Sequence, residues 1–256
     1  MGFLINPFLF GSGLYTCDAA DFDGTNDYMR LGAALSGASD SKQLTLSMWL
    51  RFDGGDGATQ ELFNLVTTAG GSTRRFGCSR NTANRLAYIA ANAAGTTILN
   101  STHTDTITAD GNWHHFAISL DLADTGKRHA YLDGVSMTGG YAVYTDDTID
   151  YAGTNDCQVG VRGTVNRFNG CMAEVFFDET YIDLSVAANL QKFRSVAGKP
   201  VSLGADGSTP LGAQPLVYLR VADGAAVTTF ANNLGSGGGT LTITGTLDLC
   251  DSSPTD

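Results

Sequence analysis

The segment Asp110-Gly-Asn-Trp-His-His-Phe-Ala-Ile-Ser-Leu-Asp121, followed by His129-Ala-Tyr-Leu-Asp-Gly134, decides the fold. Asp110 and Gly111 form a loop, and the residues after them alternate as in a β-strand. Because side chains alternate across a strand, one pleat carries Trp113, His115, Ala117 and Ser119, and the other carries His114, Phe116, Ile118 and Leu120. We therefore predict a β-hairpin here.

The rest of the chain is also typical of short strands joined by glycine turns. Its 256 residues include 32 Gly and only 5 Pro, and 43% are hydrophobic against 16% charged, which argues against disorder. Residues 44–52 alternate strictly, with Trp49 opposite the apolar pleat, so we expect the second pleat to be at least partly covered. Sandwiches of this length commonly form one domain. We predict an apolar arm at 1–17 and a single sandwich over 18–256.

Helical spacing is confined to one segment after the strands. The apolar residues that repeat at helical intervals are Val186, Leu190, Phe193 and Ala197. Ser185 can cap the start, and Gly198 with Pro200 can end the repeat. We predict a short helix over 185–197, a Gly, Pro and Ser-rich connection over 199–215, and return strands over 216–249.

The charge balance limits the partners of the protein. Its formal charge is −11, from 26 acidic and 15 basic side chains, and such a field repels nucleic acid and anionic membranes. No stretch approaches the roughly 20 apolar residues that span a bilayer, and the N-terminus lacks the basic start of a secretion signal. We expect a soluble protein that binds neither nucleic acid nor membrane.

The cysteines are odd in number and widely spaced, without a C-x-x-C pair that would indicate zinc. They are Cys17, Cys78, Cys157, Cys171 and Cys250. Isolated buried thiols, made in a reducing cytoplasm, are the favoured interpretation. A pair between Cys157 and Cys171 across a hairpin stays open at this point.

Several short segments occur in an order shared with one superfamily. They are Phe22-Asp-Gly…Asp-Tyr28, Leu46-Ser-Met-Trp-Leu50, Gly111-Asn-Trp-His-His-Phe-Ala117, Tyr131-Leu-Asp-Gly134, Val159-Gly160 and Phe168-Asn-Gly…Ala-Glu-Val175. On these residues, 22–185 resembles the laminin-G-like, concanavalin A-like jelly rolls. The resemblance implies an all-β fold: a two-sheet antiparallel jelly-roll β-sandwich, with one short helix near the C-terminal third.

The tail carries a second resemblance. Tyr181-Ile-Asp-Leu-Ser…Pro200…Leu-Gly-Ala-Asp-Gly207…Pro215-Leu-Val-Tyr-Leu219 is similar to a subgroup of these domains in tailed bacteriophages and prophages. This resemblance implies a virion protein assembled in a bacterial cytoplasm.

Two motifs suggest chemistry but favour structural roles. His114 and His115 are adjacent in a strand and point to opposite faces, so they cannot readily share a metal, and in the resembling family this motif packs in the core. The related glycanases carry alternating acids on one strand, whereas here Phe176 separates Glu174 from Asp178. We therefore predict that the protein is not an enzyme.

Acidic residues near the first turn offer a cation site. Similar sandwiches often hold calcium between an early loop and a late strand, and Asp23, Asp27 and Asp178 could supply its ligands. The favoured alternative is that these early aspartates cap the backbone of a turn. No cofactor is required, and a structural calcium ion is compatible with the sequence.

The apolar arm needs a surface on which to dock, because each large apolar side chain gains roughly 1.5–3 kcal/mol on burial. Its candidate contact residues are Phe3, Leu4, Ile5, Phe8, Leu9 and Phe10. Docking on its own sandwich and docking on a second subunit or larger assembly are equally weighted, so a homo-oligomer is one outcome.

These observations lead to a ranked set of functions. The main prediction is a non-catalytic phage virion protein that decorates the capsid through contacts with capsid or other virion proteins. The alternative is a carbohydrate-binding, lectin-like module of a phage tail or bacterial surface that stacks glycans on Tyr141, Tyr144 and Tyr151. A glycoside hydrolase is a distant third.

Overall fold

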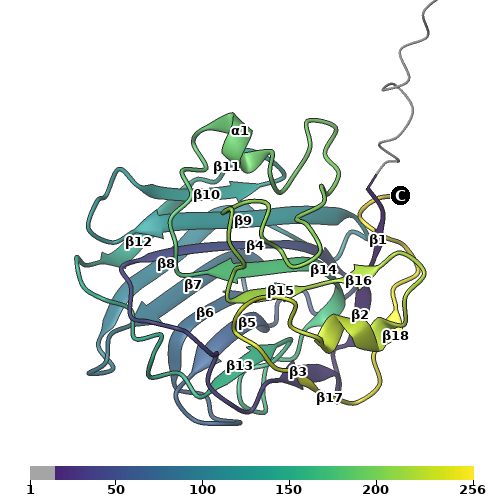
Figure 1. Ribbon diagram of the computed structural model, residues 1–256, viewed down its shortest axis with the longest axis horizontal. Coiled ribbons are helices and arrows are strands. Elements are labelled where there is room, and N and C mark those ends of the chain that lie inside the picture. The colour runs from purple at the N-terminus through teal and green to yellow at the C-terminus, as the bar shows by residue number, and fades with distance from the viewer. Residues whose placement is uncertain (1–14) are drawn as a thin grey trace, which may run out of the picture.

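A computed structural model describes residues 15–256 as two antiparallel sheets packed face to face. This confirms the predicted all-β sandwich. Figure 1 views it with one sheet in front and the other behind, and we call them the front sheet and the back sheet. The predicted assembly residues Phe3, Leu4, Ile5, Phe8, Leu9 and Phe10 lie outside the described part of the chain.

Each sheet has eight strands. The front sheet runs β11 (Val135–Ser136), β10 (Arg128–Leu132), β9 (Trp113–Asp121), β4 (Gln43–Phe52), β14 (Asn169–Asp178), β2 (Ala20–Asp23) and β18 (Asp248–Leu249), with β15 (Val217–Leu219) paired to β14. The back sheet runs β12 (Gly139–Tyr144), β8 (Thr97–Thr106), β7 (Arg85–Ala91), β6 (Arg74–Arg80), β5 (Gln60–Val66), β13 (Asp156–Val159), β3 (Tyr28–Arg30) and β17 (Thr242–Thr244). A two-stranded ribbon joins β1 (Cys17–Asp18) to β16 (Val221–Ala222).

The predicted hairpin is present as β9 and β10. Ile118 pairs with Ala130, and Ala117 pairs with Tyr131. The apolar pleats of the two sheets meet in a core rich in aromatic rings, such as Phe63 and Phe177 with centroids 5.1 Å apart. The alternation seen in the sequence therefore positions both sheets.

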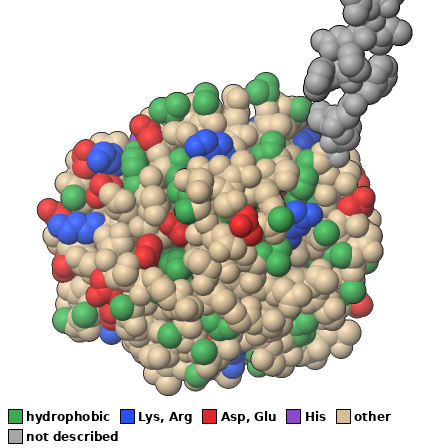
Figure 2. All heavy atoms as spheres, in the orientation of Figure 1, with side chains coloured by type: hydrophobic (Ala, Val, Ile, Leu, Met, Phe, Trp, Pro, Cys, Tyr) green, Lys and Arg blue, Asp and Glu red, His purple; other side chains and the backbone are tan. Residues whose placement is uncertain are grey.

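The outer face of the front sheet is covered by the chain itself. Residues 179–216 pack Leu184, Phe193 and Leu203 against Phe176 and its neighbours, and the yellow-green loops cross in front of β14 and β15 in Figure 1. Trp49 is only 2% exposed, which confirms the expectation that its pleat is covered. Figure 2 shows scattered hydrophobic side chains on this side rather than one continuous patch.

Helix is scarcer than the spacing predicts. The segment 185–197 contains only α1 (Ala187–Leu190), and a 3-10 helix spans Val227–Ala231. Ser185 does not cap α1, because its side chain and N–H are hydrogen-bonded to Asp183. The helical prediction is wrong beyond Leu190, where the chain turns so that Phe193 packs 5.1 Å from Phe176. Among residues 15–256, no helix has the length and apolar character to cross a membrane.

The cysteine prediction is partly wrong. Cys17, Cys78 and Cys157 are buried thiols, but Cys171 and Cys250 form a disulfide. Cys157 lies in the core of the sandwich, whereas Cys171 lies on the outer face of the front sheet. The two cysteines considered as a hairpin pair therefore belong to different layers.

Candidate functional site

The Trp-His-His segment of β9 does not bring reactive groups together. His115 is fully buried, with Nε2 2.8 Å from the Ser47 hydroxyl. Burial, with a smaller effect of Arg194, lowers the pKa of His115 to about 3. His114 lies on the other pleat, where a hydrogen bond of 2.6 Å between Nδ1 and Asp133 raises its pKa. The two imidazoles have separate surroundings.

The carboxylates of β14 are engaged inside the protein. Glu174 is buried at a β-bulge with a φ of 50°. Its two oxygens accept hydrogen bonds from the hydroxyls of Tyr15 (2.6 Å) and Tyr218 (2.7 Å), and burial raises its pKa. Asp178 is also buried and accepts the Leu216 N–H at 3.0 Å. These residues do not form the pair flanking a sugar that glycoside hydrolysis requires.

The predicted calcium ligands are not brought together as a set. Asp23 pairs with Asn169 at the start of β14, whereas Asp178 lies at the other end of this ten-residue strand. A strand of that length spans about 30 Å. Asp178 therefore cannot complete a site with Asp23 and Asp27, and its inclusion is a wrong prediction.

Other acids surround Asp23 and Asp27 instead. A hollow of about 300 Å³ is lined by Asp21, Asp23, Asn26, Asp27, Thr246 and Asp248. Asp23 Oδ1 accepts hydrogen bonds from three backbone N–H groups of its own turn, at 2.7, 2.9 and 3.1 Å. Asp21 and Asp248 accept no side-chain hydrogen bond from residues 15–256. Burial, followed by the Asp53 carboxylate, raises the pKa of Asp21.

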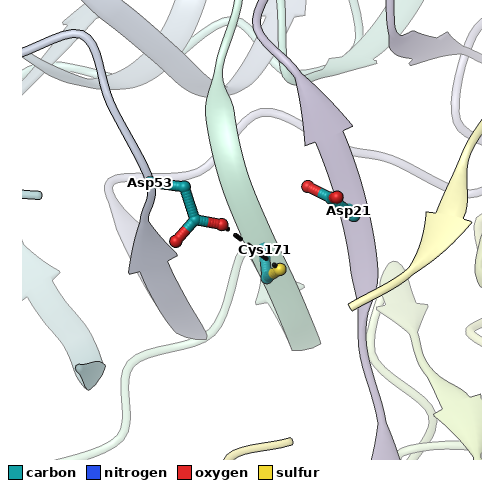
Figure 3. Close-up of side chains that lie close together, drawn as sticks. All are labelled: Asp21, Asp53 and Cys171. Atoms are coloured by element: carbon teal, nitrogen blue, oxygen red, sulfur yellow. Dashed lines mark hydrogen bonds between the residues drawn. The ribbon is translucent and has the colours of Figure 1, made fainter. Parts of the chain in front are cut away.

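A neighbouring group of possible ligands is already occupied. Figure 3 shows the carboxylates of Asp21 and Asp53 on either side of Cys171. The Cys171 sulfur is bonded to Cys250 and offers no thiolate. Asp53 accepts two hydrogen bonds of 2.8 Å from Arg51. This group is a structural contact rather than a set of free ligands.

The predicted glycan-stacking tyrosines are not available as open platforms. Tyr151 has no exposed surface, and its ring packs 5.7 Å from Phe177. Tyr141 and Tyr144 are partly buried on β12, with centroids 5.3 Å apart. The Arg128 guanidinium lies over both rings, 4.8 and 5.4 Å from their centroids. Burial excludes the stacking role for Tyr151, and Arg128 already occupies the other two rings.

The outer face of the back sheet has a different character, and we call it the open face. Cross-strand pairs place one row of side chains across its width: Arg30, Gln158, Asn64, Gly77, Ile89, Asn100 and Val143. A second row contains Glu61, Ser79, Ala87 and Thr102. Most of these side chains can donate or accept hydrogen bonds, and only small aliphatic groups lie between them.

A shallow depression of about 180 Å³ lies in the middle of the open face. Its lining includes Arg74, Ser79, Ala87, Ile89 and Asn100. Guanidinium, hydroxyl and amide groups at one side of an aliphatic floor are suited to a polyhydroxylated ligand, which needs several directional hydrogen bonds and a small apolar contact. The open face is therefore the candidate binding site.

The sequence analysis missed this site because it carries no motif. Strands at 75–79, 85–90 and 96–100 are recognisable, and alternation puts Ser79, Ala87, Ile89 and Asn100 on one face. The only signal was that this pleat is more polar than its counterpart around Trp49.

Comparison with known proteins identifies the family and similar folds. Residues 23–178 match the family described as the concanavalin A-like lectin/glucanases superfamily. A putative carbohydrate binding protein from Bacteroides ovatus is 14% identical with a TM-score of 0.59, over 94% of this chain and 62% of that one. A heptameric SAP-like pentraxin from Limulus polyphemus is 14% identical with a TM-score of 0.51, over 70% of this chain and 84% of that one. No curated protein sequence matches the chain.

Proposed function

The chain belongs to the concanavalin A-like lectin/glucanase superfamily, and from this premise we propose that it is a non-catalytic, lectin-like carbohydrate-binding module. The single observation that carries the proposal is the open face. There, hydrogen-bonding side chains surround an aliphatic depression and remain accessible, while the other sheet is covered by the chain itself. The similarity in fold to a putative carbohydrate binding protein is in keeping with this role.

Binding rather than hydrolysis fits the carboxylate of this face. The Glu61 side chain has no exposed surface and contacts two arginines, Arg74 and Arg162. A general acid or nucleophile must reach the glycosidic bond, together with a second carboxyl group. Glu61 is instead placed to hold the arginines in position.

The test is quantitative binding on a glycan array followed by calorimetry with the best ligand. We expect Asn100→Ala to lower affinity about tenfold, because it removes hydrogen bonds worth about 1–1.5 kcal/mol. Tyr144→Ala is the matched control at the edge of the sandwich and should bind normally. Loss of binding in Tyr144→Ala with normal binding in Asn100→Ala would assign the glycan site to the sandwich edge instead.

A virion location remains a proposal. None of the solved structures named above is a capsid protein, so the capsid-decoration prediction gains no support from them. A lectin-like module on a phage tail needs only the open face, and the Cys171–Cys250 disulfide suits a virion or cell surface, where thiols stay oxidised. A mass-spectrometric inventory of purified virions tests this location: a few copies per particle indicate a tail, and hundreds indicate the shell.

We also propose that the acidic hollow at Asp21, Asp23 and Asp248 can bind a structural calcium ion. Carboxylates are hard oxygen ligands, and the raised pKa of Asp21 reflects burial and neighbouring acids that a cation would compensate. A rise in Tm with calcium that Asp248→Asn abolishes would support the site. An unchanged Tm at millimolar calcium would exclude it.

A further inference from the structure

The open face concentrates positive charge in a chain that is acidic overall. Arg74 Nη2 and Arg162 Nε both contact the same oxygen of Glu61, Oε1, at 3.5 and 3.0 Å. Two guanidinium groups against one carboxylate leave one positive charge at this point, whereas the whole chain carries −11. The local charge of the site is therefore opposite in sign to that of the protein.

Most hydrogen-bond donors of these two arginines are unused. Within residues 15–256, Glu61 is the only side-chain or backbone acceptor for either guanidinium. Each guanidinium has five N–H donors, so Nε and Nη1 of Arg74 and both terminal nitrogens of Arg162 remain available. The side chains are 22% and 27% exposed, so a ligand can reach these nitrogens without unfolding any element.

The surroundings hold the arginines in this arrangement. Asn64 Nδ2 donates to Glu61 Oε2 at 3.2 Å, which fixes the carboxylate from its second oxygen. Gly77 leaves room for Arg74, because a Cβ at this position would lie 2.4 Å from Arg74 Cδ. Burial lowers the pKa of Arg74, Glu61 raises it, and the nearby Arg162 lowers it further, but arginine remains charged in proteins. The two cations are thus preorganised at one edge of the depression.

We propose that the open face recognises acidic saccharides, with Arg74 and Arg162 binding a carboxylate or sulfate group while Asn100 and Ser79 bind sugar hydroxyls. This inference rests on the proposed glycan-binding function and names its ligand class. Charge-assisted hydrogen bonds are about twice as strong as neutral ones, and guanidinium groups match the oxygens of both anions. The Glu61 carboxylate holds the arginines together before the ligand arrives, which reduces the entropy lost on binding.

The experiment compares matched ligands on the full chain by calorimetry. One pair is a galacturonic acid oligosaccharide and its carboxyl-reduced galactose counterpart, and the other is a sulfated galactan oligosaccharide and its desulfated form. We expect the charged member of at least one pair to bind about tenfold more tightly. Preference within the first pair identifies carboxylate, and preference within the second identifies sulfate.

Two protein variants locate the effect. Arg162→Gln and Arg74→Lys should each reduce the preference for the charged ligand several-fold, the second because lysine keeps the charge but loses the planar fork. Lys42→Gln removes the same charge outside the open face, where Lys42 pairs with Asp146, and should leave the preference unchanged. Thermal unfolding of each variant verifies that the fold is retained.

The outcomes separate this inference from the proposed function. Equal binding of charged and neutral ligands that Asn100→Ala abolishes would overturn the inference and leave the glycan-binding function intact. A charge preference that neither Arg162→Gln nor Arg74→Lys alters would place the anion site elsewhere and also overturn it. Absence of binding to every saccharide tested would overturn the proposed function as well.

Discussion

The two outer faces of the sandwich follow the same alternation but carry different residues. The front sheet presents Trp49, Ala117 and Phe176, which the segments 179–216 and 250–256 cover, whereas the back sheet presents Ser79 and Asn100, which no such segment covers. Apolar outer residues need a second layer because leaving them in water costs free energy. Polar outer residues do not, so that face can be used for binding. The composition of the outward pleat therefore distinguishes structural surface from binding surface.

The largest difference between the two faces should appear in stability. Phe176→Ala should lower the free energy of unfolding by about 3–5 kcal/mol, because it empties a fully buried site beneath the covering layer. Ile89→Ala, its counterpart on the open face, should cost roughly 1 kcal/mol because Ile89 is already partly exposed. Urea denaturation measures both. Equal losses would mean that the covering layer adds no second core.

The disulfide should have the next largest effect. The double variant Cys171→Ser with Cys250→Ser should lose about 2–4 kcal/mol of stability, because the bond closes a loop with a sequence separation of 79 residues. Reductant should produce a similar loss in the unmodified protein and none in the double variant. Glycan affinity should stay the same, since the bond lies on the covered side. A loss of affinity at retained stability would link the two faces.

A smaller effect concerns pH. The folded pKa of His115 is about 3, against an ordinary value of 6.5, so the unfolded chain takes up this proton first as the pH falls. His115 should therefore reduce stability as pH decreases from 6.5 toward 3, by up to about 1.4 kcal/mol per pH unit. In NMR titrations its ring should stay neutral through this range. A normal titration near 6.5 would show that the covering layer does not exclude water.

The smallest stability change should come from the open face itself. Asn100→Ala should alter the free energy of unfolding by no more than about 0.5 kcal/mol, as expected at an uncovered position. The same variant should lose glycan affinity. A large destabilisation would show that this face is structural, and the distinction between the two faces would then fail.

The sequence predicted the architecture well because alternation is a local signal. Each apolar pleat, such as that of 44–52, indicates a strand and its inward face without knowledge of its partner. The predicted helix over 185–197 failed for the opposite reason. Phe193 has helical spacing, but its packing against Phe176, a residue 17 positions earlier, takes it away from the helical path. Local periodicity does not reveal such tertiary contacts.

The candidate sites were harder to predict because they depend on register. Asp178 looked like a partner for Asp23 in the sequence, yet a ten-residue strand separates them. Glu61, Arg74 and Arg162 lie far apart in the sequence and meet only because β5 pairs with both β6 and β13. Tyr151 looked like a loop aromatic, but its hydroxyl donates to the Gln43 carbonyl from inside the core. No residue type or spacing encodes these placements.

The ribbon of β1 and β16 gives the domain a definite polarity. Thr255 donates a hydrogen bond to the Cys17 carbonyl, so the first described strand and the C-terminal end lie side by side, as Figure 1 shows near β1. Both ends thus emerge over the front sheet, on the side away from the open face. A scaffold joined to either end would hold every copy with its open face directed outward. A row of such copies could engage a repeating polymer at many points, so that weak individual contacts would add up to firm adhesion.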